Sequence, residues 1–349
     1  MVMSWHPASV LEDLRFVRSK DVGTWYGDVV VAWDSLLPVE EADRRTSWRN
    51  LGYWTDATAS LDEACAALAG RLADAAGVTA GQDVLDVGCG AGESTFLLHR
   101  RVGGGSRVAR VVGLDLTAEH IARARRRGPG PGFVVGSATA LPLPDASVDR
   151  VLALECAFHF PDRTAFFAEA YRVLRPGGVL GLADVLVSPG FARTLAVTDR
   201  LLPARVRGTL HGLAADILKM PTGNLVDRDR YLAQLRAAGF RVGPVQDVTE
   251  HVFPYFKRYW RQAQSPGRQA ELLRAAGTAP EQAAARARAW RRQMRVLMLG
   301  WRTSRFLLVC AVRDGGAAVS EPERSQGERG ARRAGRPALA PGGQAEERA

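Results

Sequence analysis

The stretch Val84-Leu85-Asp86-Val87-Gly88-Cys89-Gly90-Ala91-Gly92 decides the fold of this chain. Its first four residues are apolar apart from Asp86, as in a buried strand, and three glycines follow at alternate positions. A turn without side chains lets the backbone approach a ligand closely. The helix expected at 93–102 adds the positive potential of its N-terminus. The stretch therefore predicts a strand, a turn and a helix that together hold a nucleotide-like cofactor.

Strands alternate with helices along most of the chain. We expect strands at 84–87, 110–114, 132–136, 148–154, 179–183, 241–252 and 305–312, and helices at 60–76, 93–102, 118–127, 163–174 and 229–238. Apolar strands separated by helices imply an α/β fold with a parallel, doubly wound sheet and helices on both faces.

Composition divides the chain further. Two proline-containing segments interrupt the strand–helix alternation and are interpreted as helical lid insertions, and the final segment has almost no large apolar residues, as in disordered chains. The predicted parts are an N-terminal helical cap (1–58), a cofactor-binding core (59–185), a helical lid insertion (186–228), a core helix with strand six (229–253), a second, basic lid insertion (254–300), the last core strand (301–313) and a disordered tail (314–349).

The net charge of +10 is concentrated in one segment. Between Phe253 and Arg313 there are 13 Lys or Arg residues and two acids, so the rest of the chain is close to neutral. The simplest interpretation is a solvated, arginine-rich helical face. Attraction to an anionic substrate and peripheral membrane contact through 254–300 are the alternatives. No nucleic-acid-binding motif accompanies the charge, so we expect no nucleic-acid partner.

Cysteine spacing and hydropathy set further limits. The four cysteines are scattered and form no CxxC pair, which supports neither a zinc site nor a disulfide framework, and we expect no metal. The N-terminus lacks a basic region followed by an apolar core, and no apolar run reaches the roughly 18 residues of a spanning helix. We therefore expect a soluble, cytoplasmic protein, while the sequence leaves its oligomeric state open.

Two acids and three glycines form the predicted cofactor site. Asp86 ends the first strand, and Asp115 ends the second, 23 residues after Gly92. An acid at the tip of the second strand can accept hydrogen bonds from both ribose hydroxyls. The glycine spacing is G-x-G-x-G rather than the G-x-G-x-x-G of dinucleotide binders. Without a pyrophosphate to bind, a cofactor with an adenosine and a small charged tail fits better.

Four motifs in order resemble those of class I S-adenosylmethionine-dependent methyltransferases. They are 84–92, 111–116, 140–149 (ALPLPDASVD) and 174–178 (LRPGG). The subfamily that the chain most resembles is the small-molecule group of natural-product O-methyltransferases and tocopherol and sterol C-methyltransferases. The resemblance implies a Rossmann-like, seven-stranded, mostly parallel sheet, S-adenosyl-L-methionine as the cofactor, and a small-molecule substrate.

The resemblance also assigns cofactor-binding roles. Asp86, with Gly88, Gly90 and Gly92, would hold the methionine end of the cofactor. Asp115 would bind the ribose and Leu116 would pack on the adenine. Ser137 and Ala138 lie where the family contacts the adenine edge, and Tyr53 belongs to an aromatic entry turn that would close over the cofactor.

Catalytic candidates follow the fourth and fifth strands, where this fold presents substrate. Methyl transfer to a hydroxyl requires removal of a proton, which suits a histidine. We expect His159 to act as the general base and Asp184 to orient it, or to stabilise its charge; the alternative for His159 is a packed histidine under the lid. Glu155 is expected either to bind the amino group of the cofactor or to stabilise a substrate cation. His251 is a further candidate for the pocket.

Several functions remain open from the sequence. O-methylation leads, with His159 as the expected base, and the apolar residues of both lid insertions indicate a fairly large, lipophilic substrate. C-methylation of an isoprenoid, sterol or quinol follows, and N-methylation is third. A macromolecule methyltransferase is less favoured because the fourth strand ends in Glu-Cys-Ala-Phe rather than Asn/Asp-Pro-Pro-Tyr. A cofactor-binding protein without catalysis is the remaining alternative.

Overall fold

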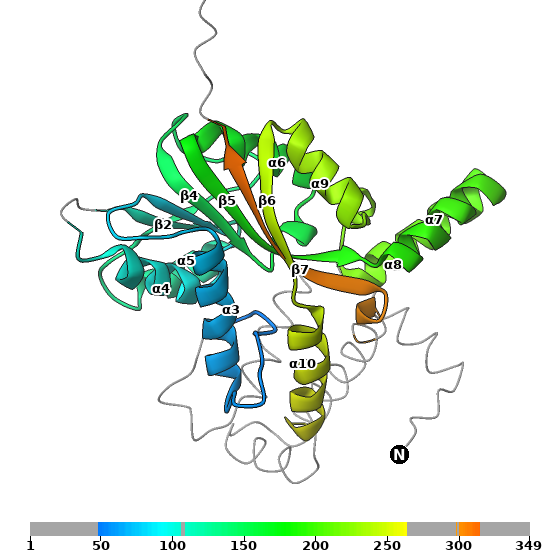
Figure 1. Cartoon of the computed structure of the whole chain (residues 1–349), viewed down its shortest axis with the longest axis horizontal. Helices are drawn as coiled ribbons and strands as arrows, with labels where there is room; N and C mark the ends of the chain where they lie inside the picture. The colour runs from blue at the N-terminus through cyan, green and yellow to red at the C-terminus, as the bar shows by residue number, and fades with distance from the viewer. Residues whose placement is uncertain (1–47, 106–108, 264–297, 299, 315–349) are drawn as a thin grey trace, which may run out of the picture. The chain divides into compact units, whose positions relative to one another are not determined.

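The computed structural model describes residues 48–105, 109–263, 298 and 300–314. These residues contain a seven-stranded sheet of order β3-β2-β1-β4-β5-β7-β6 (Figure 1). The strands are β1 (Val84–Val87), β2 (Val111–Asp115), β3 (Gly132–Val135), β4 (Val148–Leu154), β5 (Leu174–Val187), β6 (Phe240–Asp247) and β7 (Ser304–Arg313). β7 is antiparallel to β5 and β6, and the pairs among β1 to β5 are parallel. The predicted mostly parallel, Rossmann-like sheet is confirmed.

The helices lie between the strands as the sequence predicts. They are α3 (Leu61–Ala75), α4 (Glu93–Val102), α5 (Ala118–Arg125), α6 (Arg163–Val173), α7 (Pro189–Leu201), α8 (Ala204–Leu218), α9 (Arg228–Ala237) and α10 (Thr249–Ala263), with short 3-10 turns η2 (Ala157–His159) and η3 (Thr222–Asn224). Ser60 caps α3, its side chain accepting a hydrogen bond from the Glu63 amide at 3.2 Å.

The predicted sixth strand is wrong in its last part. Strand β6 ends at Asp247, and 249–252 form the first turn of α10. Val248, Val252 and Phe256 are all buried at a spacing of four residues, which is a helical rather than a strand period. The second insertion therefore begins as α10 before residue 254. The predicted N-terminal cap lies outside the described residues up to 47, and 48–59 contain no helix; 264–297 and the predicted tail from 315 also lie outside.

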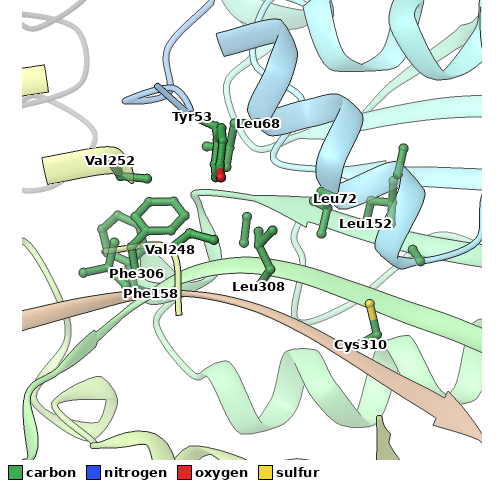
Figure 2. Packing of buried hydrophobic residues seen from close by; sticks show 14 of the residues in the cluster. Tyr53, Leu68, Leu72, Leu152, Phe158, Val248, Val252, Phe306, Leu308 and Cys310 are labelled. Atoms are coloured by element: carbon green, nitrogen blue, oxygen red, sulfur yellow. The ribbon is translucent and has the colours of Figure 1, made fainter. Parts of the chain in front are cut away.

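Alternate residues of the central strands face different helices, as a sheet covered on both faces requires. Leu152 and Ala183 share a cluster with α3, α4 and α10, whereas Val151 and Leu182 share another with α6 and α9. Figure 2 shows the first cluster, where side chains of α3, α10 and strands β4 and β7 meet. This packing fixes the strand ends from which the site is built.

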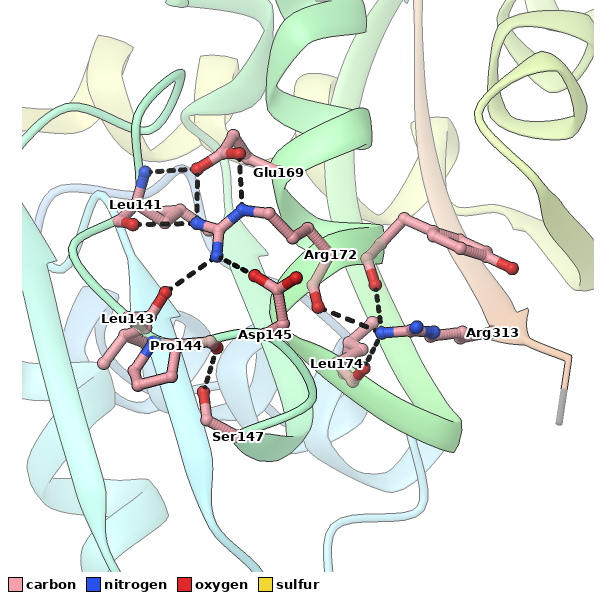
Figure 3. Close-up of polar contacts among 10 residues, drawn as sticks. Leu141, Leu143, Pro144, Asp145, Ser147, Glu169, Arg172, Leu174 and Arg313 are labelled. Atoms are coloured by element: carbon pink, nitrogen blue, oxygen red, sulfur yellow. Dashed lines mark hydrogen bonds and ion pairs between the residues drawn. The ribbon is translucent and has the colours of Figure 1, made fainter. Parts of the chain in front are cut away.

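The motif at 140–149 has a structural role. Arg172 of α6 donates to the carbonyl oxygens of Leu141 and Leu143 and pairs with the Asp145 carboxylate at 2.7 Å (Figure 3). Glu169 binds the same guanidinium at 2.7 Å and accepts from the Leu141 amide. One helix therefore holds the loop that follows β3, and both acids of the motif form ion pairs, Asp145 with Arg172 and Asp149 with Arg175.

Candidate active site

A cavity of about 570 Å³ opens at the carboxyl ends of β1, β2 and β4, the edge at which α/β sheets bind ligands. It is lined by residues from four places: Trp48, Arg49 and Asn50; Gly88 to Ala91 with Glu93 and Ser94; Asp115 to Thr117 with His120; and Leu154 to Cys156 with His159, Phe160, Pro161 and Pro221. Residues far apart in the sequence thus converge on one site, as the motifs predict.

The glycine turn forms one wall of the cavity. Gly88, Gly90 and Gly92 have φ of 69°, 54° and 88°, a left-handed region that disfavours side chains. A Cβ on Gly88 would lie 2.7 Å from the Cys156 sulfur, and one on Gly92 would lie 2.9 Å from the Phe133 ring. A Cβ on Gly90 would meet nothing within 4 Å. Gly90 therefore presents bare backbone to the cavity, whereas Gly92 serves the packing behind it.

Asp115 is held ready to accept hydrogen bonds. One carboxylate oxygen accepts from the Gly90 amide at 2.9 Å, and the other accepts from the Thr117 amide and contacts His120 Nδ1 at 3.2 Å. Burial raises the pKa of Asp115, but these hydrogen bonds outweigh it and the pKa lies below its usual value. The side chain is an ionised acceptor beside Leu116, which is 71% exposed at the cavity wall.

Asp86 lies below the turn and does not line the cavity. Its Oδ2 accepts hydrogen bonds of 2.6 Å from the hydroxyls of Ser94 and Thr95 in the first turn of α4. Burial raises its pKa to about 6. The carboxylate therefore ties the end of β1 to the start of α4 and fixes the turn between them.

Glu155 faces the cavity from the end of β4. Its backbone has a φ of 55°, unusual for a residue with a side chain and typical of functional sites. Its Oε2 accepts from the Leu51 amide at 2.9 Å, so it ties β4 to the segment 48–54. Burial raises the pKa of Glu155 to about 8, and the negative charge of Asp184 adds to the shift. A cationic ligand beside this half-buried carboxyl group would lower its pKa and favour the ionised form.

His159 lines the same cavity from η2. Its Nδ1 lies 2.5 Å from the Lys219 carbonyl oxygen, which can only accept, so Nδ1 carries the hydrogen and Nε2 is the basic nitrogen. Burial lowers the pKa of His159 to about 4, and the imidazole is neutral at pH 7. The tautomer leaves Nε2 as the proton-accepting nitrogen, and the lowered pKa makes it a weaker base than an exposed imidazole.

Comparison with known proteins agrees with this geometry. A family model described as a methyltransferase domain matches residues 85–182. Over 241 residues the chain is 38% identical to erythromycin 3''-O-methyltransferase of Saccharopolyspora erythraea, covering 66% of this chain and 74% of that enzyme. The chain belongs to the S-adenosylmethionine-dependent methyltransferase family.

Two further similarities mark the breadth of this family and fold. Sterol 24-C-methyltransferase of Eremothecium gossypii is 35% identical over 129 residues, which covers 35% of this methyltransferase and 33% of that enzyme. The crystal structure of the cyclase SpnF matches with a TM-score of 0.60 at 22% identity, covering 84% of this chain and 96% of that one. The second likeness shows the fold alone.

The cavity of the methyltransferase fits S-adenosylmethionine. The open face of Gly90 leaves room for a ligand against the backbone, and Leu116 offers an apolar side chain that a flat base would cover. Asp115 and Glu155 line the cavity, so its acidic groups suit a cofactor that carries a sulfonium and an amino group, whereas the Glu93 carboxylate is already paired with Arg127. These residues would hold the cofactor, which supplies an electrophilic methyl group when bound.

Asp184 lies elsewhere than the sequence suggested. Asp184 is 1% exposed and does not line the cavity. His159 Nδ1 donates its hydrogen to the Lys219 carbonyl oxygen rather than to the Asp184 carboxylate. Its Oδ1 accepts from the Phe158 amide at 3.0 Å, while Oδ2 faces Arg163 at 3.3 Å and accepts from Tyr231 at 3.0 Å. Asp184 is thus placed to position the backbone of η2 rather than the imidazole itself.

Four further candidates stand back from the cavity. Tyr53 is buried against His251, with ring centroids 4.5 Å apart, and the His251 Nδ1 contacts the Trp54 carbonyl oxygen at 3.0 Å. Ser137 bonds Thr139, and Ala138 is part of the core. None of the four lines the cavity. His251 of α10 therefore holds the aromatic entry turn from behind.

Sequence reasoning missed two positioning residues. Asn224 donates to the carbonyl oxygens of Phe158 and Phe160 at 3.1 and 2.8 Å, on either side of His159. Lys219, in a left-handed conformation after α8, supplies the carbonyl that orients the imidazole. Neither belongs to a motif, and backbone carbonyls carry no sequence signal. In the described part of the chain there is no group of three potential metal ligands and no helix able to cross a membrane.

Proposed function

We propose that the methyltransferase methylates a hydroxyl group of a small, lipophilic natural product, with His159 as the general base. The observation that supports this most directly is the Nδ1 contact of His159 with Lys219, which leaves Nε2 as the proton acceptor in the cavity. The relative from Saccharopolyspora erythraea is named as an O-methyltransferase. Apart from Glu155 and His159, the wall beyond the glycine turn includes apolar Trp48, Phe160 and Pro221.

Different residues of the chain have different roles in the proposed reaction. Asp115 and the turn at Gly90 fix the cofactor, and the apolar wall holds the acceptor and excludes water. The neutral Nε2 of His159 takes the hydroxyl proton as the oxygen becomes positively charged during its attack on the methyl group. The Lys219 carbonyl stabilises the imidazolium that results, because Nδ1–H donates to it.

C-methylation is the second candidate, and Glu155 favours it. Its carboxyl group lines the cavity beside His159 and, when ionised, would stabilise a carbocation formed from an alkene. The relative from Eremothecium gossypii is named as a sterol C-methyltransferase.

One experiment separates the two candidates. The full chain is incubated with methyl-labelled S-adenosylmethionine and two substrate panels, glycosylated macrolides and prenylated quinols or sterols, and the products are mapped by mass spectrometry and NMR. We expect methyl label on oxygen, with turnover lost in His159→Ala. Label on carbon, lost in Glu155→Gln but kept in His159→Ala, would replace the proposal with the second candidate.

A further inference from the structure

Helices α7 and α8 form a hairpin that projects beyond the sheet (Figure 1). It carries four of the six large hydrophobic side chains that are exposed among the described residues, and these are Val197, Leu201, Val206 and Leu210, with exposed fractions of 52%, 75%, 46% and 38%. In each helix the two residues are four positions apart and so lie on one side of it. An apolar patch of this kind marks an interaction surface.

The fold does not need these side chains. The hairpin is anchored at its base, where Leu195, Ala214 and Leu218 are buried in the core. Ser188 caps α7 by accepting from the Phe191 amide at 3.3 Å. The four exposed residues lie between these anchors, toward the connection at 202–203. Between 38% and 75% of each side chain stays exposed, so covering this apolar surface would be favourable.

Basic residues share the hairpin with the apolar patch. Within 189–210 there are four arginines (Arg193, Arg200, Arg205 and Arg207) and one acid, Asp199, a net charge of +3. Asp199 is already engaged, lying 3.1 Å from His211 and 3.7 Å from Arg207. A second copy of the hairpin would bring two such basic surfaces together, so the charge favours an anionic partner instead.

We propose that the α7–α8 tip docks on an anionic lipid surface, inserting Leu201 and its apolar neighbours while the arginines meet the headgroups. Apolar side chains flanked by arginines are the composition of interfacial membrane anchors. α8 ends at Leu218, next to the Lys219 carbonyl that orients His159, so the docked hairpin leads into the cavity wall. The enzyme would then collect its lipophilic acceptor from the membrane.

Vesicle sedimentation of the full chain tests the proposal. We expect binding to phosphatidylcholine vesicles that contain phosphatidylglycerol, weak binding to phosphatidylcholine alone, and loss of binding at high salt. The double variant Leu201→Glu/Val206→Glu should bind roughly tenfold or more weakly, because two apolar side chains no longer transfer into lipid. Val135→Glu, at a 48% exposed position on strand β3, is the matched control and should bind like wild type.

Three results would overturn the proposal. The hairpin variant could bind vesicles as wild type does, which would place any membrane contact elsewhere in the chain. Light scattering could show a wild-type dimer that Leu201→Glu/Val206→Glu converts to a monomer, which would assign the patch to a second copy. Wild type could bind equally to vesicles with and without phosphatidylglycerol, which would remove the proposed role of the arginines. Circular dichroism and turnover of a soluble acceptor, both expected at wild-type levels, verify that the variant is folded.

Discussion

The imidazole Nδ1 of His159 lies 2.5 Å from the carbonyl oxygen of Lys219, across 60 residues of sequence. This contact selects the tautomer with its lone pair on Nε2 and holds the ring at the cavity wall. It also links the base to the end of α8, since Lys219 follows that helix directly. The segment that follows α8 therefore takes part in building the cavity wall at His159, where Pro221 also lies.

Replacing His159 with alanine is expected to lower kcat by roughly 10²–10⁴-fold, the usual contribution of a general base. The affinity for S-adenosylmethionine, measured by calorimetry, should change little, because the groups proposed to hold the cofactor are Gly90, Asp115 and Glu155 rather than His159. His211→Ala, on α8 and outside the cavity, is the matched control and should keep wild-type turnover. A His159→Ala enzyme with normal kcat would refute the assignment.

Asp184→Asn should destabilise the fold strongly. Arg163 and Asp184 are each 1% exposed and lie 3.3 Å apart, so the substitution leaves a buried guanidinium without its counter-charge. We expect a loss of about 3–5 kcal/mol in the free energy of unfolding, measured with urea. Asp145→Asn removes the partner of Arg172 at a 75% exposed carboxylate and should cost about 0–1 kcal/mol. Equal losses in the two variants would contradict a structural role for the buried pair.

The sequence predicted the fold almost completely. Apolar runs between turn residues, with the glycine turn, located all seven strands, although β5 (Leu174–Val187) extends beyond the predicted 179–183 at both ends. The error at 249–252 arose where Val252 and Phe253 sit in a short apolar run, which does not distinguish a strand end from a helix start. Bounds of the lids were harder to predict because prolines interrupt their pattern.

Only part of the candidate site could be predicted from the sequence. Gly90, Asp115 and Leu116 line the cavity because strand ends fix their position, and motif spacing reports strand ends. The partners of Asp184 could not be predicted from the sequence, since Arg163 and Tyr231 reach it from two helices whose packing is set by tertiary contacts. The contacts made by the Lys219 carbonyl and the Leu51 amide could not be predicted either, because main-chain groups are the same at every position of a sequence.

Gly92→Ala should lower stability more than a left-handed backbone alone requires. Gly92 and Gly104 have similar φ values, 88° and 83°, but a Cβ meets the Phe133 ring at 2.9 Å in the first case and nothing within 4 Å in the second. We expect Gly104→Ala to cost about 1 kcal/mol for backbone strain, and Gly92→Ala to exceed it by roughly 1–3 kcal/mol for overpacking. Thermal unfolding monitored by circular dichroism measures both. Equal shifts would mean that Phe133 moves aside freely.

The affinity for S-adenosylmethionine should depend on pH through Glu155. Burial raises the pKa of its carboxyl group to about 8, so the ligand-free enzyme holds a proton there at pH 7. A cationic cofactor in the same cavity favours the carboxylate, so binding releases that proton. The dissociation constant should therefore rise as pH falls below 8, by up to about tenfold per unit, and level off above it. S-adenosylhomocysteine, which lacks the sulfonium charge, should show a weaker dependence.

In Glu155→Gln the side chain cannot titrate, and comparison with it removes the contribution of the cofactor's own amino group. Calorimetry in two buffers of different ionisation enthalpy counts the protons directly; equal proton release by wild type and Glu155→Gln would show that another group carries the linkage.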